Sequence, residues 1–139
     1  MKCMIDTNVF WDVFLGQEPF FSASRDVLSL CEKKKIHGFI SASSATDIFY
    51  IIRKRLGSTQ KAYDALGNVL NIVKILTVTN DDVNTAFLAK AKDFEDCLLA
   101  TCARSNRCDA IITRNKEAFQ NFEITLYSPE EILALYHQQ

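Results

Sequence analysis

A length of 139 residues is typical of one domain, and we predict a single domain over residues 1–139. A chain of this size buries about two thirds of the surface it exposes when unfolded, so folding requires no disulfide or metal ion. The formal net charge of −1 excludes a general attraction for polyanions. Contact with a nucleic acid would therefore depend on local basic runs, such as residues 33–35 and 53–55, which are also typical of solvated helix ends.

The cysteines indicate whether the protein works in a reducing or an oxidising compartment. Their number is odd, they lie mostly in apolar runs and they show no C-x-x-C spacing, so we predict free thiols packed as small core residues in a reducing environment: Cys3, Cys31, Cys97, Cys102 and Cys108. The acid Asp6 precedes any long apolar stretch, which argues against a signal peptide, and no run approaches the ~20 apolar residues of a membrane span. We expect a cytoplasmic protein with no membrane contact.

Short apolar runs alternate with longer segments of helical period along the chain. The runs that predict strands, rich in Ile and Val, are residues 2–5, 36–40, 74–78, 110–113 and 124–127. Helices are predicted over residues 9–15, 23–34, 44–56, 59–72, 81–91, 94–105 and 129–136, with a short turn at 116–119. Parallel neighbours need crossover connections, so this alternation predicts an α/β fold with about five mostly parallel strands and helices on both faces.

Turn and capping residues support these boundaries. Gly38 is expected in the turn into the second strand, and Gly57 with Ser58 separates two helices. Ser128 is a predicted N-cap, followed by Pro at the first helical position and Glu131 at the third. Either Asn80 or Asp81 is expected to cap the helix over residues 81–91.

Oxygen-bearing side chains recur just after predicted strands. Asp6 follows the first strand, Asp47 lies in the helix after the second, and Thr113, Arg114 and Asn115 end the fourth. Ligands of open parallel sheets bind at the carboxyl ends of the strands, so these groups would converge. With Asp96 they would form an oxygen-rich pocket suited to a hard divalent cation.

Helical spacing favours Asp47 and Asp96 as site residues. Asp47 shares a face with Ser44, Tyr50 and Ile51, so we expect it against the packed side of its helix. Asp96 lies over Leu99, Ala100 and Ala103, and the small alanines would let its helix approach the sheet closely. Capping competes as an explanation, because acids in the first turn of a helix also favour the macrodipole.

The remaining polar residues are weaker candidates. Asp93 is assigned mainly to capping, and Glu95 either to the helix dipole or to a supporting role in the site. Asp109 precedes its strand and belongs at the opposite edge of the sheet, and Asp12 is expected to face solvent. Two histidines, His37 and His137, have no partner that would suggest catalysis or zinc binding.

These segments together resemble the PIN domain family, which includes the toxin nucleases of VapBC-type toxin–antitoxin pairs. The resemblance covers essentially the whole chain through residues 6–9, 41–50, 93–98 and 111–115. It implies a three-layer α/β/α sandwich and a metal-dependent ribonuclease. Asp6, Asp47 and Asp96 match the acidic positions of the family, and Asn8 and Thr113 match its polar supports. Two departures stand out: Asp47 is commonly Glu in the family, and Asn115 is often Asp.

The resemblance also implies a reaction, hydrolysis of RNA, with Mg²⁺ or Mn²⁺ held by Asp6 and Asp96 and reached by Asp47 directly or through water. It suggests a homodimer and a small antitoxin partner whose arginine could enter the acidic pocket, with apolar residues of 48–56 and the next helix available for association. Substrate choice would depend on residues 53–55, on residues 16–21 and on Arg114. Stacking of bases could use Trp11, Phe20 or Phe21, which are equally typical of a core.

Two other classes of protein are compatible with parts of this pattern. A phosphatase with an aspartyl nucleophile also places an acid after its first strand, but it needs a second acid two residues later, where this chain has Asn8. A catalytically weak RNA- or protein-binding module on the same fold would account for Asn115 and the slightly acidic net charge. Cleavage that depends on manganese and stops with a chelator would separate the enzyme from this module.

Overall fold

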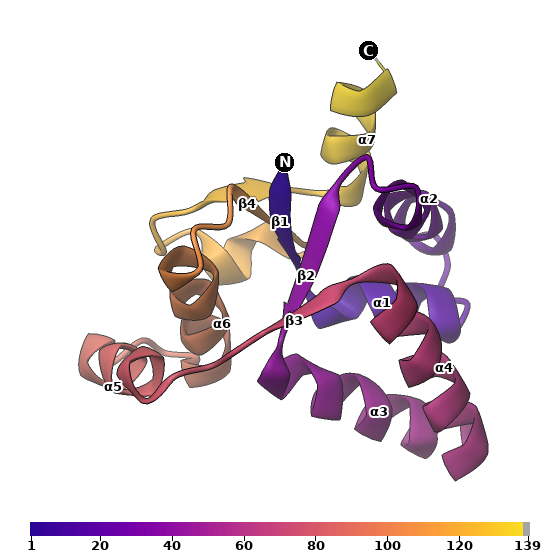
Figure 1. Cartoon of the computed structure of the whole chain (residues 1–139), viewed down its shortest axis with the longest axis horizontal. Coiled ribbons are helices and arrows are strands. Elements are labelled where there is room, and N and C mark those ends of the chain that lie inside the picture. Colours follow the sequence, from indigo (N-terminus) through magenta and orange to yellow (C-terminus); the bar gives the residue numbers. More distant parts are fainter. Residues whose placement is uncertain (138–139) are drawn as a thin grey trace.

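In the computed structural model, which describes residues 1–137, five parallel strands form one sheet covered by helices on both faces (Figure 1). The strands are β1 (Lys2–Ile5), β2 (His37–Ser41), β3 (Lys74–Leu76), β4 (Ala110–Ile112) and β5 (Thr125–Tyr127). The helices are α1 (Thr7–Phe14), α2 (Phe21–Glu32), α3 (Ala42–Leu56), α4 (Thr59–Ile72), α5 (Asn80–Ala89), α6 (Phe94–Ser105) and α7 (Pro129–His137), with a 3₁₀ turn η1 (Lys116–Phe119). None of the helices within residues 1–137 is long and apolar enough to cross a bilayer. The predicted α/β fold is confirmed.

The order of strands places a crevice at the centre of the sheet. The chain runs outward from β1 through β2 to β3, then returns past β1 to form β4 and β5, which gives the order β3-β2-β1-β4-β5. Neighbouring β1 and β4 are paired in parallel, with Ile5 opposite Ile112. The direction of winding therefore reverses between β1 and β4. At such a switch point the connecting loops diverge to opposite faces and leave room for a ligand.

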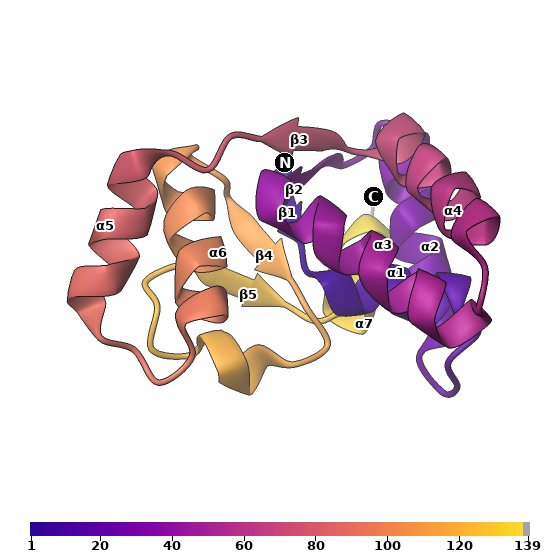
Figure 2. The same cartoon turned by 90° about the horizontal axis from the view of Figure 1, so that it is seen from below.

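Side chains of each central strand alternate between two apolar cores. In β1, Cys3 and Ile5 belong to the core that α1, α2, α3, α4 and α7 cover, whereas Met4 belongs to the core under α6 and η1. Helix α5 packs on the outside of α6. Figure 2 shows α5 and α6 on one side of the sheet and α3 and α4 on the other. Both faces of the sheet are buried, as expected for parallel strands.

Helices α1 and α3 begin earlier than predicted because side chains cap them. Helix α1 starts at Thr7, since the Asp6 carboxylate accepts the Thr7 amide at 2.8 Å. Helix α3 starts at Ala42, since the Ser41 hydroxyl accepts the Ser44 amide at 3.2 Å. Capping by the residue that ends each strand leaves almost no loop between β1 and α1 or between β2 and α3, so strand ends and helix starts lie at one edge.

Two predicted details are wrong. Thr79, and neither Asn80 nor Asp81, caps α5, in a capping box in which Thr79 and Asp82 exchange hydrogen bonds of 3.0 Å. Gly38 lies within β2 and not in a turn: a Cβ at this position would come within 2.8 Å of the Cys31 sulfur. The glycine is needed for the close approach of α2 to the sheet.

Other local predictions are confirmed. Gly57 ends α3 in the left-handed conformation at φ +63°, and Ser128 and Glu131 exchange two hydrogen bonds at the start of α7. The cysteines are free thiols, four of them buried in the cores: Cys3, Cys31, Cys97 and Cys102. Asp109 lies at the amino edge of the sheet, where its carboxylate accepts the Lys2 amide at 2.7 Å.

Candidate active site

A cavity of about 180 Å³ lies at the carboxyl ends of the central strands and is lined mainly by oxygen-bearing side chains. Seven residues proposed from the sequence line it: Asp6, Asn8, Trp11, Asp47, Glu95, Asp96 and Asn115. They come from the residue after β1, from α1, α3 and α6, and from the turn after β4, which lie far apart in the sequence. Ser43 and Ser44, in the first turn of α3 near Asp47, also line the cavity and were not among the site residues predicted from the sequence.

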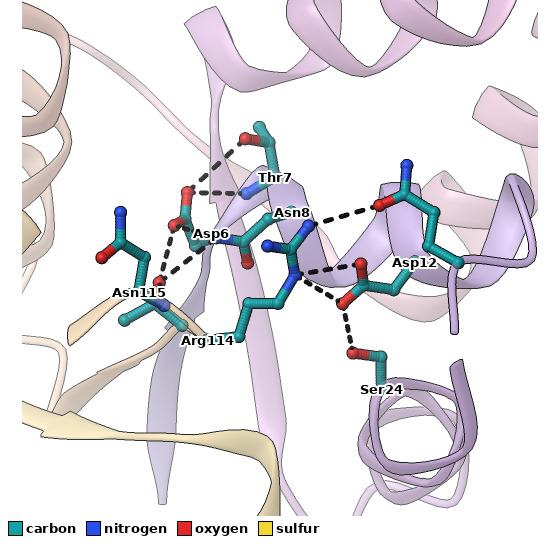
Figure 3. A network of polar contacts seen from close by, with 9 residues as sticks. Asp6, Thr7, Asn8, Asp12, Ser24, Arg114 and Asn115 are labelled. Carbon is teal, nitrogen blue, oxygen red and sulfur yellow. Dashed lines mark hydrogen bonds and ion pairs between the residues drawn. The ribbon is translucent and has the colours of Figure 1, made fainter. Parts of the chain in front are cut away.

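The Asp6 carboxylate is held in place by several donors (Figure 3). One oxygen accepts the Thr7 amide at 2.8 Å, and the other accepts the Thr113 hydroxyl at 2.8 Å and the Asn8 side-chain amide at 3.0 Å. Burial raises the pKa of Asp6, and the hydrogen bonds from Thr113 and Thr7 oppose that rise. The orientation of the carboxylate is therefore fixed by the chain before any ligand arrives.

Thr113 connects the turn after β4 to Asp6. Its hydroxyl oxygen is fully buried and accepts the Asn115 amide at 3.0 Å and the Asn8 side-chain amide at 3.4 Å. Because both partners are donors, the hydroxyl proton must point to Asp6. Asn8 and Thr113 thus both donate hydrogen bonds to the same oxygen of Asp6. Asn8 also shows why an aspartyl-nucleophile phosphatase does not fit, since it supplies a donor where that enzyme needs an acid.

Asp96 faces Asp6 from the start of α6. Asp93 caps this helix by accepting the Asp96 amide at 3.0 Å, and Ala100 and Ala103 are buried against the sheet as predicted. Burial, and then the charges of Asp93 and Asp6, raise the pKa of Asp96 to about 6. Two carboxylates thus meet across the switch point at a site that favours a compensating cation.

Asp47 and Glu95 form the outer part of the cavity. The prediction that Asp47 lies on the packed side of its helix together with Ser44 and Tyr50 is wrong for Tyr50, which is 59% exposed, whereas Ser44 is buried and Asp47 is half-buried at the cavity wall. A hydrogen bond to the Asp47 carboxyl, followed by burial and nearby charges, raises the pKa of Glu95 to about 7. Near neutral pH the Glu95 carboxyl is therefore protonated for part of the time, which lowers the negative charge of the cluster.

Asp12 contradicts the expectation that it faces solvent. It is fully buried, and its carboxylate accepts Arg114 Nε at 3.0 Å and the Ser24 hydroxyl at 2.9 Å (Figure 3). The signal was present in the spacing, because Asp12 follows the buried Val9 by three residues and so shares its helix face. The network joins α1 and α2 to the turn that carries Thr113 and Asn115.

The same network changes the expected role of Arg114. Its guanidinium lies against Asp12, donates to Gln17 Oε1 at 3.4 Å and sits 4.4 Å from the centre of the Phe20 ring. Phe20, a proposed stacking residue, is thus partnered by Arg114, and residues 16–21 contact the site through it. This arrangement favours a supporting role for Arg114 over direct contact with a substrate.

The donor set fits a hard cation. Carboxylate and amide oxygens line the cavity, and the Asn8 side-chain oxygen is buried without a hydrogen-bond donor among the residues described. Within residues 1–137, no group of three or more His, Cys, Asp or Glu side chains is gathered closely enough to hold a metal ion by itself. Mg²⁺ commonly binds to one or two carboxylates and completes its shell with water and substrate phosphate, which matches an Asp6–Asp96 pair.

Comparison with known proteins identifies the fold. The PIN domain family matches residues 2–117 of the chain. Similar solved structures include DNA-bound VapBC from Salmonella typhimurium, with 16% identity and a TM-score of 0.71 over 93% of this chain and 98% of that chain. VapBC2 from Rickettsia felis, bound to a DNA fragment from its promoter, has 15% identity and a TM-score of 0.70 over 92% and 98% of the two chains.

A third similar structure is that of a toxin with a named cleavage target. VapC20 from Mycobacterium tuberculosis, described as a Sarcin-Ricin loop cleaving toxin, has 15% identity and a TM-score of 0.68 over 86% of this chain and 95% of that chain. No curated protein matches the sequence significantly. At these identities the structural likeness establishes the fold, in agreement with the family match.

Proposed function

The chain belongs to the PIN domain family, and we propose that it is a metal-dependent endoribonuclease, the toxin of a toxin–antitoxin pair. One observation chiefly supports this proposal: Asp6 and Asp96 line the same cavity at the switch point of the sheet, and the charge of Asp6 helps to raise the pKa of Asp96. RNA is preferred as the substrate because of the family and because one structural relative is described as cleaving the Sarcin-Ricin loop.

The proposed cofactor is Mg²⁺ or Mn²⁺, held by Asp6 and Asp96 and reached by Asp47 through water. When bound, such an ion would neutralise charge on a phosphodiester and make a water molecule more acidic. Thr113 and Asn8 keep the Asp6 carboxylate aimed into the cavity. Asn115 lies at the cavity wall and can offer an amide oxygen without adding charge.

The proposed partners are a small antitoxin protein and a second copy of the chain. Several structural relatives are toxin–antitoxin complexes. Large apolar side chains are exposed on α3 and α4, among them Tyr50, Leu56, Tyr63 and Leu70, whereas Ile48 and Ile52 of α3 are fully buried. Only the first group is available for association. Light scattering at micromolar concentration tests the homodimer, and a purely monomeric protein would contradict it.

A cleavage assay tests the enzyme. Single-stranded RNA should be cut in the presence of Mn²⁺ or Mg²⁺, and cutting should stop with chelator and return when the ion is restored. Asp96→Asn should abolish cutting, whereas Asp109→Asn, at the opposite edge of the sheet, should leave it unchanged. Equal activity with and without chelator would overturn metal dependence. RNA binding without any cleavage would instead support a catalytically weak binding module.

A further inference from the structure

A larger cavity of about 920 Å³ adjoins the candidate active site between α5, α6 and η1. We call it the α6 groove. It shares three lining residues with the smaller cavity, Asp96, Asn115 and Ala118, so the two cavities lie side by side. Figure 2 shows α5 and α6 together on the side of the sheet away from α3 and α4. The groove therefore leads away from the proposed metal ligands on one side of the molecule.

The two cavities differ in the size of the chemical group that each can hold. Cavities that hold small organic ligands usually measure about 300–1,000 Å³, so about 180 Å³ suits an ion with a phosphate group and is small for a nucleoside. The α6 groove lies within the range for nucleoside-sized ligands. A strand whose phosphate occupies the smaller cavity must place its neighbouring nucleosides elsewhere, and the adjoining groove offers that room.

One face of α6 forms a wall of the groove. Asp96, Ala100 and Arg104 follow one another at intervals of four residues, which places them on the same helix face. Ala100 has a small side chain that is almost fully buried, so it leaves space between the charged side chains of Asp96 and Arg104. Arg104 lies two helical turns, about 12 Å, beyond Asp96. The helix thus places Arg104 at a set distance from the proposed catalytic acid Asp96, in the direction in which an RNA strand would run.

The guanidinium of Arg104 is available for a new partner. It pairs with Glu123 at a distance of 3.7 Å, and the two side chains are 54% and 89% exposed. An exposed pair at this distance is weak and exchanges readily with solvent or with a phosphate. Phe122 borders the same groove and packs edge-on against the buried Phe119, with 6.3 Å between ring centres. Its ring is therefore held as a rigid wall.

The charges of the groove favour a nucleoside with one phosphate contact over a long run of phosphates. Four carboxylates and two cations line it, so it does not attract polyanions as a whole: Asp93, Asp96, Glu117, Glu123, Lys92 and Arg104. Thr101 and Asn121 add neutral hydrogen-bonding groups. Such groups suit the edge of an unpaired base, which is how single-stranded RNA is usually read.

We propose that the α6 groove binds a nucleoside of single-stranded RNA next to the cleaved phosphodiester, with Arg104 contacting a backbone phosphate and Asn121 the edge of the base. The inference rests on the proposed ribonuclease function and adds a subsite to it. Arg104 and Asn121 would then set the affinity for the strand and part of its sequence preference, while the acids of the smaller cavity set the rate of cleavage.

The experiment measures binding without cleavage. A fluorescein-labelled single-stranded RNA of mixed sequence is titrated by anisotropy in chelator at several salt concentrations, with wild type, Arg104→Gln, Glu123→Gln and Arg107→Gln. Arg107 follows α6 and lies outside the groove, so it serves as a matched control cation. Arg104→Gln should weaken binding and make the plot of log K against log salt shallower by about 0.7. Arg107→Gln should change neither, and Glu123→Gln should tighten binding by releasing Arg104.

Other results would overturn the subsite. Equal affinities and salt slopes for Arg104→Gln and Arg107→Gln would remove Arg104 from the RNA path, as would an absence of measurable binding by wild type. If Arg104→Gln left RNA binding intact but weakened a protein partner, the groove would be a protein-docking surface. Cleavage is assayed separately: RNA binding that depends on Arg104 without any cleavage would refute the nuclease and leave the subsite standing.

Discussion

The Nε atom of Arg114 lies 3.0 Å from both carboxylate oxygens of Asp12, and this pair ties the turn after β4 to α1. Asp12 is fully buried, whereas the Arg114 side chain is 27% exposed. Loss of the arginine would leave a buried carboxylate with only the Ser24 hydroxyl as a donor. Loss of the acid would leave an arginine that water can still reach.

This asymmetry predicts unequal effects on stability. Arg114→Met should lower the free energy of unfolding by roughly 3–5 kcal/mol, because it leaves the buried carboxylate of Asp12 without a cation. Asp12→Asn should lower it by less, and the double variant should recover part of the loss of Arg114→Met. Urea denaturation measures all three. The exposed pair of Arg25 and Asp26 is the control, where Arg25→Met should change stability by about 0–1 kcal/mol. Equal losses at both arginines would show that burial of Asp12 does not matter.

The carboxylates of the smaller cavity predict opposite effects on activity and stability. Asp96→Asn should abolish metal-dependent cleavage and hold or slightly raise the stability of the metal-free protein, because it removes one of several like charges. Asp6→Asn should also abolish cleavage. It should stabilise less, since both Asp6 oxygens accept hydrogen bonds and an amide nitrogen would face donors. Thermal melts in chelator test this, and a clear loss of stability in Asp96→Asn would make that acid structural.

The raised pKa values predict how stability varies with pH. The pKa values of Glu95 and Asp96 in the folded chain are about 7 and about 6, above the ordinary values of these groups. At pH values between the ordinary and the raised pKa, the folded chain therefore binds more protons than the unfolded chain. Without metal, the free energy of unfolding should therefore fall as the pH rises from about 4 to about 7. Urea denaturation at pH 5 and pH 8 measures the fall, and Glu95→Gln should reduce it.

A control for this pH effect lies at the start of α7, where the carboxyl pKa is shifted in the opposite direction. The pKa of Glu131 is lowered to about 2 by Lys116, 2.8 Å away, and by the hydrogen bonds of the α7 cap. Its contribution is present above the ordinary carboxyl pKa and is lost as the pH falls toward about 2. Glu131→Gln should therefore leave the difference between pH 5 and pH 8 unchanged. Stability that rises between these pH values would contradict the assigned causes for Glu95 and Asp96.

The sequence predicted the fold and most of the candidate site because both depend on short patterns. Strand lengths, helix periods and the position of Asp6 after β1 are local, and parallel topology then brings strand ends together. Long-range pairs were less accessible. The partner of Asp12 lies 102 residues away, so nothing near Asp12 in the sequence indicates the pair. The depth of Asp47 could not be read from its helix either, because α3 projects beyond the sheet and leaves Tyr50 in solvent.

Asn115 offers a test of how charge controls metal affinity. Its amide lines the cavity, and its backbone is fixed by the hydrogen bond to Thr113. Asn115→Asp should tighten Mn²⁺ binding, since it adds a negative charge facing the cation with little change of shape. Titration calorimetry measures the affinity, and Asn121→Asp, in the groove outside the smaller cavity, is a matched control. Equal or weaker affinity in Asn115→Asp would place this side chain beyond reach of the ion.

The acidic cavity also predicts how a protein partner would inhibit the enzyme. A pocket that attracts a divalent cation should equally attract an arginine, whose planar guanidinium can donate two hydrogen bonds to carboxylates such as Asp6 and Asp96. The partner and the ion would then compete for one site. Raising the Mn²⁺ concentration should weaken inhibition by a cognate partner, and replacing the inserted arginine by lysine should weaken it further, because a point charge cannot make the paired contact. Inhibition that is unchanged over a hundredfold range of Mn²⁺ would refute this competition and leave the nuclease assignment intact.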